Sequence, residues 1–293
     1  MHILEWQAGG ATGSAMDESF IFAEDQNWFV VTQPSEGVYA IREPLHDEDV
    51  RSYLLTGSEK ALLVDTGMGV SDISRIVKGI TRLPVMVVNS HAHWDHVGGN
   101  CQFGDIAIHA AEATRLSDPD LTTALRNACA PERLYGPLPP EVTRETLSIP
   151  PSRATTLLHG GESFDLGGRT FEAIHTPGHA AGLLVFLDRQ AGVLLSTDAV
   201  YPGPLYAQFE ECDLNAYLAS LNALAKLAPA LNHVHPSHNA DEMPVSLIVQ
   251  MRDSMAEVVA GRRPDEVGDD HATHWFDGFG IYVTSGYRGS RTA

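Results

Sequence analysis

The stretch His91-Ala92-His93-Trp94-Asp95-His96-Val97-Gly98-Gly99 places four possible metal ligands within six positions. The run before it, 84–88, is continuously apolar and predicts a strand covered on both faces in an α/β sheet. Because this run stops at Asn89-Ser90, we expect the histidines on the loop at the strand's carboxyl end, the usual place for a site in layered α/β proteins. His91 and His93 can point the same way in extended backbone, while Asp95 and His96 reach a neighbouring point. One segment could therefore supply two metals; the alternative is a polar loop whose histidines cap a helix or face water.

Four other short motifs accompany this stretch. In chain order they are Leu63-Val64-Asp65-Thr66-Gly67, Thr176-Pro177-Gly178-His179, Ser196-Thr197-Asp198 and Pro236-Ser237-His238. Each motif alone is weak, but the five together, in this order over residues 37–240, resemble the metallo-β-lactamase superfamily, and within it the glyoxalase II and lactonase-like branch. The resemblance implies an α/β fold with a four-layer αββα sandwich.

The local patterns agree with that architecture. Apolar runs predict strands, and a helix capped by Ser71 follows from Ile73, Ile76, Val77 and Ile80 at i, i+3, i+4 and i+7. With the strands on either side, this helix forms a β-α-β unit, which should be parallel and right-handed. Asp213 should cap a second helix, and a third should run from Pro244 to near Gly261. Strands are expected at 28–31, 38–41, 52–55, 61–64, 182–187 and 192–195, the last two forming a hairpin.

We expect one domain over residues 1–293, because no linker, repeat or low-complexity tract divides the chain. Residues 1–36 form an N-terminal extension. The proline-studded insertion 110–150 is predicted to be a lid over the site, the alternative being a surface excursion remote from it. The aromatic C-terminal tail, 262–293, is expected to wall an apolar pocket or to join a homodimer contact, unless it is only a final strand over the core.

The family resemblance assigns the ligands residue by residue. His91, His93 and His179 would hold one metal; Asp95, His96 and His238 would hold the other; Asp198 would bridge both. The local sequence agrees, because His179 follows a Thr-Pro-Gly turn and Asp198 follows an apolar strand. The remaining histidines we interpret as ordinary polar residues: His109, His159, His175, His233, His271 and His274.

Two assignments keep alternatives. The segment 232–238 contains three histidines, and His235 competes with His238 as the ligand. Asp65 should accept a hydrogen bond from the distal ring N–H of a ligand, a partner that fixes the tautomer and raises ligand basicity. Asp65 could instead, or in addition, form an Asx-type turn with Thr66 and Gly67.

Five imidazoles and two carboxylates suit zinc, so two Zn²⁺ are expected, with iron or manganese as alternatives. A water between two such ions loses a proton near neutral pH and gives a bridging hydroxide nucleophile. The expected activity is hydrolysis of an ester, lactone or thioester bond of a small acyl substrate. Asp95 or Asp198 would transfer the proton that the leaving group receives. Tyr201, three residues after Asp198, resembles the carbonyl-binding tyrosine of acyl-homoserine lactonases; it could also simply pack in its proline-rich loop.

Three other functions compete with this one. They are β-lactam hydrolysis, a mononuclear iron oxidoreductase of the persulfide dioxygenase type, and a regulatory protein that binds metal without turnover. Metal analysis separates the iron enzyme from the hydrolases, and an ester and lactone panel separates the regulatory protein from the first hypothesis.

Composition limits the partners. The net charge is -19, with 38 acidic against 19 basic residues, which disfavours nucleic acid and anionic membranes. Cys101, Cys129 and Cys212 are sparse and odd in number, as in reduced cytosolic proteins. No export signal or long apolar run is evident, so we expect a cytoplasmic protein with a small-molecule substrate.

Overall fold

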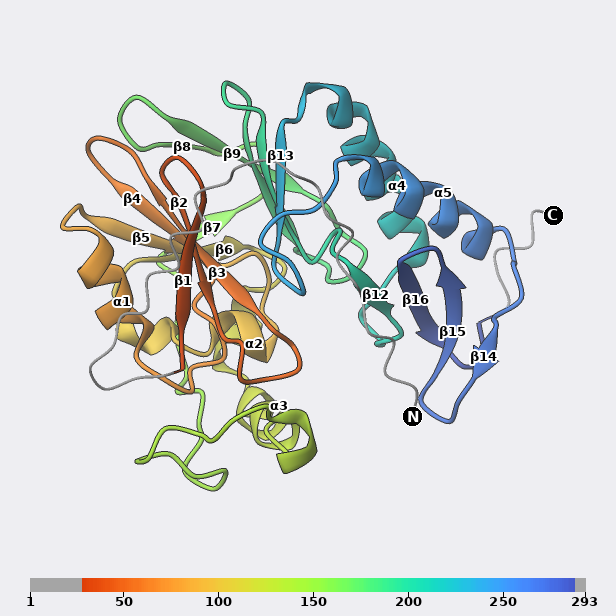
Figure 1. Cartoon of the computed structure of the whole chain (residues 1–293), viewed down its shortest axis with the longest axis horizontal. Helices are drawn as coiled ribbons and strands as arrows, with labels where there is room; N and C mark the ends of the chain where they lie inside the picture. The colour runs from red at the N-terminus through yellow and green to blue at the C-terminus, as the bar shows by residue number, and fades with distance from the viewer. Residues whose placement is uncertain (1–27, 288–293) are drawn as a thin grey trace.

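The computed structural model describes residues 28–287, and its largest sheet has seven strands in chain order (Figure 1). The first three pairings are antiparallel and the last three are parallel. The strands are β1 (Val30–Ser35), β2 (Val38–Arg42), β3 (Arg51–Thr56), β4 (Ala61–Val64), β5 (Val85–Val88), β6 (Ile106–His109) and β7 (Thr156–Leu158).

A second sheet of five strands packs against the first, in the order β13-β11-β10-β9-β8. Its central hairpin joins β10 and β11 as the sequence predicts, while β11 and β13 are parallel. The strands are β8 (Ser163–Asp165), β9 (Thr170–His175), β10 (Leu184–Asp188), β11 (Val193–Thr197) and β13 (His233–Pro236).

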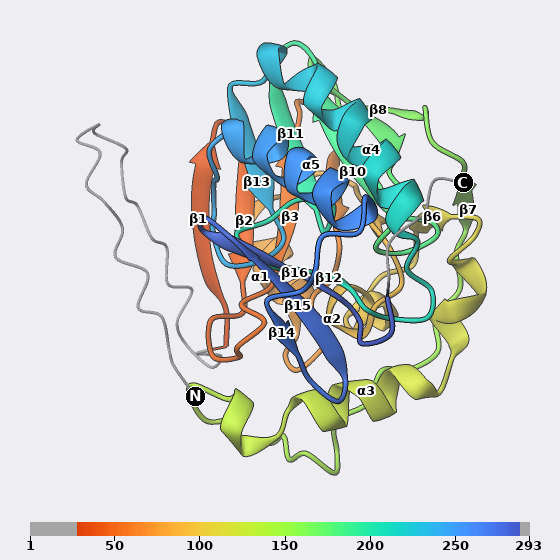
Figure 2. The ribbon, with the colours of Figure 1, turned by 90° about the vertical axis from the view of Figure 1, so that its right-hand side faces the viewer.

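Alternating side chains divide the core into layers. On β10, Leu184 and Phe186 face the first sheet, whereas Val185 and Leu187 face the helices on the other side. These helices, α4 (Leu214–Leu227) and α5 (Ser246–Val259), lie side by side on the outer face of the second sheet (Figure 2). The apolar face of α1 (Ile73–Ile80) packs on the opposite, outer face of the first sheet. The order helix, sheet, sheet, helix is the four-layer sandwich that the sequence predicts.

The helix ends show which caps were predicted correctly. Asp213 accepts hydrogen bonds from the backbone N–H groups of Asn215 and Ala216, as expected for the cap of α4. Ser71 does not cap α1; the cap is Asp72, whose side chain accepts from the N–H of Ser74. The other helical segments are α2 (Trp94–Val97), α3 (Asp120–Ala128) and four 3-10 turns, η1 (Asn100–Gln102), η2 (Ala113–Ser117), η3 (Pro131–Arg133) and η4 (Ala228–Ala230).

Two peripheral segments add detail to the predictions. Within the predicted N-terminal segment 1–36, where a strand was expected at 28–31, residues 30–35 form the edge strand β1, which pairs with β2; residues 1–27 lie outside the described residues. The aromatic tail does not end as a single strand. It forms a third, small sheet in the order β12-β16-β15-β14, with β12 supplied by residues after Asp198. Its strands are β12 (Gly203–Ala207), β14 (Glu266–Val267), β15 (His271–Phe276) and β16 (Phe279–Thr284).

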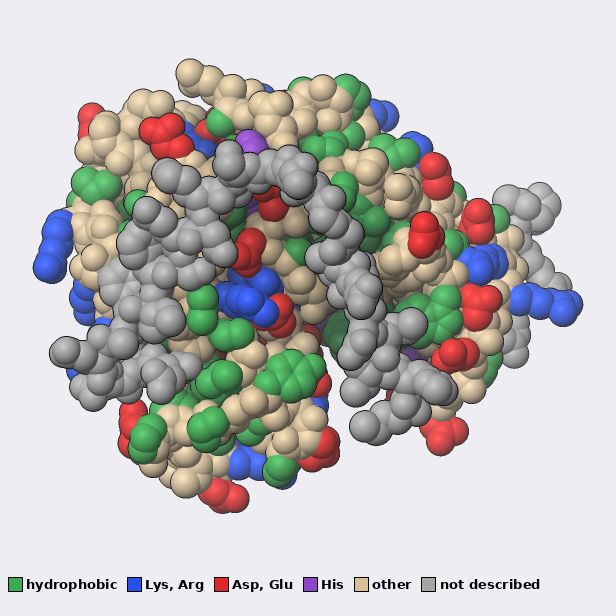
Figure 3. Space-filling view, viewed as in Figure 1, with side chains coloured by type: hydrophobic (Ala, Val, Ile, Leu, Met, Phe, Trp, Pro, Cys, Tyr) green, Lys and Arg blue, Asp and Glu red, His purple; other side chains and the backbone are tan. Residues whose placement is uncertain are grey.

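The surface matches the acidic composition. On the face that Figure 3 shows, basic side chains form small separate groups among acidic ones. Within residues 28–287, every helix is too short or too polar to cross a membrane.

Phe186 tests the packing between the two large sheets. It is fully buried there, so Phe186→Ala should lower the free energy of unfolding by about 3–5 kcal/mol, the usual cost of removing a buried aromatic ring. Val267→Ala is the control, because Val267 is 66% exposed and its loss should change stability by less than about 0.5 kcal/mol. Urea unfolding of both variants measures the difference, and equal effects would contradict the layer assignment.

Candidate metal centre

All seven predicted ligands lie just beyond the ends of strands. His91 and His93 follow β5, and the short helix α2 carries Asp95 and His96. From the second sheet, His179 follows β9, Asp198 follows β11 and His238 follows β13. The centre therefore lies at one end of the sandwich, and each of the two sheets supplies part of it.

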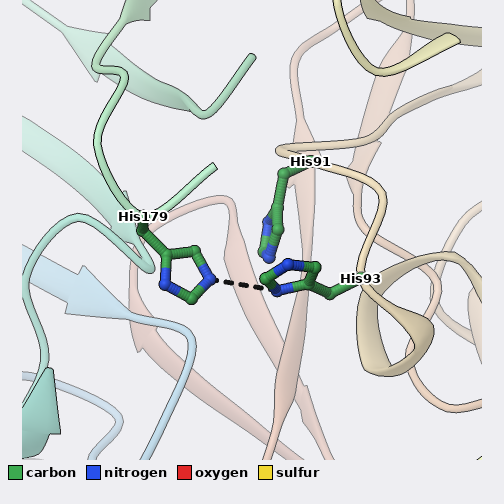
Figure 4. A group of neighbouring side chains, drawn as sticks. All are labelled: His91, His93 and His179. Atoms are coloured by element: carbon green, nitrogen blue, oxygen red, sulfur yellow. Dashed lines mark hydrogen bonds between the residues drawn. The ribbon is translucent and has the colours of Figure 1, made fainter. Parts of the chain in front are cut away.

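Three histidines form the first group of possible ligands. In Figure 4 the rings of His91, His93 and His179 converge from two chain segments far apart in sequence. Nε2 of His179 lies 3.0 Å from Nδ1 of His93, and one ligand atom from each residue lies within 4.8 Å of the others. This spacing suits three nitrogens around one ion.

A second group adjoins the first through Asp198. Asp95, His96 and His238 place one ligand atom each within 4.8 Å of one another, and so do His91, His96 and Asp198. Oδ2 of Asp198 lies 3.2 Å from Nε2 of His238 and 3.6 Å from Nε2 of His179. Asp198 thus lies between the two groups, where a bridging ligand would lie.

The distal nitrogens of these rings have partners that aim the other nitrogens inward. Nδ1 of His179 lies 2.8 Å from the carbonyl oxygen of Tyr206, and Nδ1 of His238 lies 2.8 Å from that of Glu48. Nδ1 of His96 lies 2.9 Å from Oδ2 of Asp65, the partner predicted from the sequence. Asp65 also accepts from the N–H and the hydroxyl of Ser90, so it also stabilises the turn before His91.

The inward atoms fit a cation. Nε2 of His91, Nε2 of His96 and Oδ1 of Asp198 are buried without a hydrogen-bond partner. A buried polar atom without a partner is unfavourable, and divalent ions held by the two groups would satisfy all three atoms. Nitrogen and carboxylate oxygen are also the donors that zinc, iron and manganese accept.

Burial and neighbouring charges set the protonation states. Burial, together with the neighbouring histidines, holds the pKa of His91 well below its ordinary value, so this imidazole is neutral and can bind a metal. Burial would raise the pKa of Asp198, but His238 and His96 lower it well below its ordinary value. Despite burial, Asp198 and Asp95 raise the pKa of His238 to about 9. A cation at this position would displace that proton and replace its charge.

His235, the alternative to His238, lies away from the centre. Its Nδ1 is 2.7 Å from the carbonyl oxygen of Asp241, and its ring lies beside Tyr53. Among residues 28–287, the groups with metal-ligand geometry also exclude the histidines that we interpreted as ordinary polar residues. Three of these, His109, His159 and His175, form an aromatic cluster of their own.

Two glutamates that support the centre were not predicted from the sequence. Glu211 Oε1 lies 3.3 Å from Nε2 of His93. Buried Glu112 accepts from the N–H of Ala92, between two ligands, and from the N–H of Gly182, on the loop of His179. A Cβ atom on Gly182 would lie 2.6 Å from Cγ of Glu112, so a glycine is needed for this approach. Glu112 thereby joins the two loops that carry the first group.

A cavity of about 370 Å³ opens onto both groups. The predicted lid contributes Arg115 and Ala124 to its wall, so this part of the insertion borders the site; its opening and closing stay a prediction. The described part of the tail does not line the cavity, but Tyr282 stacks on Tyr206, which does.

Tyr201 also lines the cavity, with its ring 5.3 Å from that of His238. Its hydroxyl oxygen accepts a hydrogen bond from the N–H of Tyr206 at 3.1 Å. A hydroxyl that accepts one bond still has its own hydrogen to donate. The predicted contact with a substrate carbonyl is therefore compatible with this position.

Comparison with known proteins gives related sequences over most of the chain. Acyl-coenzyme A thioesterase MBLAC2 of Gallus gallus is 29% identical over 224 residues, which cover 72% of this chain and 80% of that protein. The human protein of the same name is 26% identical over 227 residues, covering 72% and 81%.

Solved structures share the fold. A metallo-β-lactamase from Pontibacter korlensis matches with a TM-score of 0.58 at 19% identity, over 78% of this chain and 99% of that one. TTHA1623, solved in a di-iron-bound form, matches with a TM-score of 0.52 at 22% identity, over 69% and 93%. The family model described as the metallo-β-lactamase superfamily matches residues 47–238, about two thirds of the chain. The chain therefore belongs to the metallo-β-lactamase superfamily.

Proposed function

We propose that this protein is a metal-dependent hydrolase that cleaves the thioester or ester bond of a small acyl substrate. The observation that carries the proposal is the convergence of seven ligand side chains, six of them buried, beside one cavity that five of them line. The curated relatives with the thioesterase name support a thioester as the preferred bond. Lactones contain the same acyl–oxygen bond as esters and stay within the proposed range.

His91, His93 and His179 would hold one divalent ion, and Asp95, His96 and His238 the other, with Asp198 between them. When bound, two such ions would lower the pKa of a water to give a hydroxide and would polarise the scissile carbonyl. Zinc is the metal we propose, because imidazole and carboxylate ligands suit it.

The protein's own groups would position the substrate and move the proton. Asp198, whose carboxylate lies between the two groups, would pass a proton to the leaving sulfur or oxygen. Asp95 is the second candidate for this role, because it lines the same cavity. The Tyr201 hydroxyl would donate a hydrogen bond to the carbonyl oxygen as negative charge develops on it.

Hydrolysis of a substrate panel tests the proposal. Protein loaded with excess zinc should contain two metals per chain and should cleave S-acyl thioesters and aryl esters. Chelation should abolish turnover. Elemental analysis and a thiol-release assay measure these outcomes. Turnover of β-lactams alone would support the β-lactamase alternative, and one firmly bound iron with persulfide oxidation would support the dioxygenase. Two metals without turnover of any panel member would support a regulatory role.

The paired variants His238→Ala and His235→Ala test the ligand assignment. His238→Ala removes a side chain of the second group, so zinc titration of the apo-protein should lose one of two binding events. His235→Ala should keep both and instead lower the free energy of unfolding, because the buried ring bonds the carbonyl oxygen of Asp241. The reverse pattern would show that His235 is the ligand.

Asp65→Asn tests the support of His96. The amide cannot accept all three hydrogen bonds as an ionised carboxylate does, so zinc affinity or turnover should fall by about 10- to 100-fold, as for other partners of metal-bound histidines. Circular dichroism should show an intact fold. Wild-type zinc affinity together with wild-type turnover would restrict Asp65 to its turn.

A further inference from the structure

The cavity at the metal centre is strongly acidic apart from one side chain. Five carboxylates line it, and among its described lining residues Arg115 is the only lysine or arginine. These carboxylates belong to Asp47, Glu48, Asp95, Asp198 and Glu211. Carboxylates repel an anionic group at close range, and apart from the proposed metals Arg115 is the one lysine or arginine in this described lining that could offset the repulsion.

Arg115 has donors to spare. Its Nη1 lies 3.4 Å from Oε1 of Glu211, and its Nε is buried without a hydrogen-bond partner. The side chain is 38% exposed, so part of it faces solvent. Arg133, from the same insertion, differs: its Nε lies 2.9 Å from Oδ2 of Asp47 and its Nη2 lies 2.7 Å from Oε1 of Glu48. Two carboxylates therefore already bind Arg133, whereas Arg115 has one longer carboxylate contact and one donor without a partner.

The position of Arg115 relates it to the reaction. The oxygen of Glu211 that faces Arg115 is the same Oε1 that lies 3.3 Å from Nε2 of His93, one of the proposed ligands. Only the Glu211 carboxylate thus separates Arg115 from a proposed metal ligand, so a group bound by Arg115 would lie close to the bond that is cleaved. The planar guanidinium offers paired N–H donors that match a carboxylate or a phosphate.

We propose that Arg115 determines specificity by binding an anionic group, a carboxylate or a phosphate, of the acyl substrate. This inference rests on the proposed hydrolase function. The anion comes from one of two sources, a carboxylate on the acyl chain or a phosphate on the leaving thiol, and these sources require separate tests.

The test compares wild type, Arg115→Gln and Arg115→Lys, with Arg153→Gln as the control. Arg153 lies in the segment that follows the insertion; it is exposed and does not line the cavity, so its variant makes the same charge change elsewhere. One arm compares succinyl with butyryl N-acetylcysteamine thioesters. The other compares butyryl coenzyme A with butyryl N-acetylcysteamine. Calorimetry of the matching non-hydrolysable thioethers, with metal-free protein, measures binding without turnover.

In the arm that carries the recognised anion, Arg115→Gln should raise KM and the thioether Kd by roughly 10- to 100-fold, the effect of losing a hydrogen bond to a charged group. The kcat value, and the KM and Kd of the neutral compound, should change less than about twofold. Arg115→Lys should recover only part of the loss, because an ammonium group lacks the paired, planar N–H donors of a guanidinium. A response in the succinyl comparison identifies a carboxylate on the acyl chain. A response in the coenzyme A comparison identifies a phosphate on the leaving thiol. Equal losses for charged and neutral compounds, or no loss in either arm, would overturn the inference. If wild type cleaves no thioester, the hydrolase proposal fails, while the thioether Kd values still decide whether Arg115 binds an anion.

Discussion

The buried carboxylates of Asp95 and Asp198 are the constraint on which the rest of the structure depends. They are 6% and 4% exposed, in the seam between the two large sheets. Charges so deep are tolerated only when they are paired, and here five imidazoles surround them. Because the first sheet supplies Asp95 and the second supplies Asp198, the sandwich must form before either charge is compensated. A cation in this seam would link metal binding directly to the contact between the sheets.

Holding the ligands in place has a cost in the backbone. Asp65, Thr197 and Asn239 have positive φ angles of 63°, 45° and 65°, and each adjoins or contacts a ligand. Such conformations cost about 1–3 kcal/mol each in residues other than glycine, so they persist only where surrounding contacts enforce them. Thr197 donates its hydroxyl hydrogen to the carbonyl oxygen of Leu184, and Asn239 donates to that of Pro202. The strain is therefore concentrated where side-chain direction matters most.

The sequence predicted the site where possible metal ligands directly follow an apolar run that forms a strand. The run 84–88 and the ligands after it form a local pattern, and the loop at the end of β5 follows from them. The third sheet could not be predicted in this way, because β12 pairs with the distant strand β16, with Leu205 opposite Ile281, and neither strand has a distinctive pattern. Glu112 and Glu211 were missed for a related reason: a lone glutamate has no motif, and only tertiary packing brings it to a backbone N–H or to a histidine. The cap of α1 was misassigned by one residue since Ser71 and Asp72 are both good caps.

The division of ligands between the sheets also means that they are synthesised at different times. A nascent chain exposes His91, His93, Asp95 and His96 long before His179 is made, so both groups lack a member while the first sheet is already complete. His179 then completes the histidine group, and His238 completes the other only after β13 has been synthesised. Because domains generally fold as units, the centre would be complete only once both sheets have been synthesised and packed together. An ion bound before that point would be held by fewer ligands than the finished centre offers.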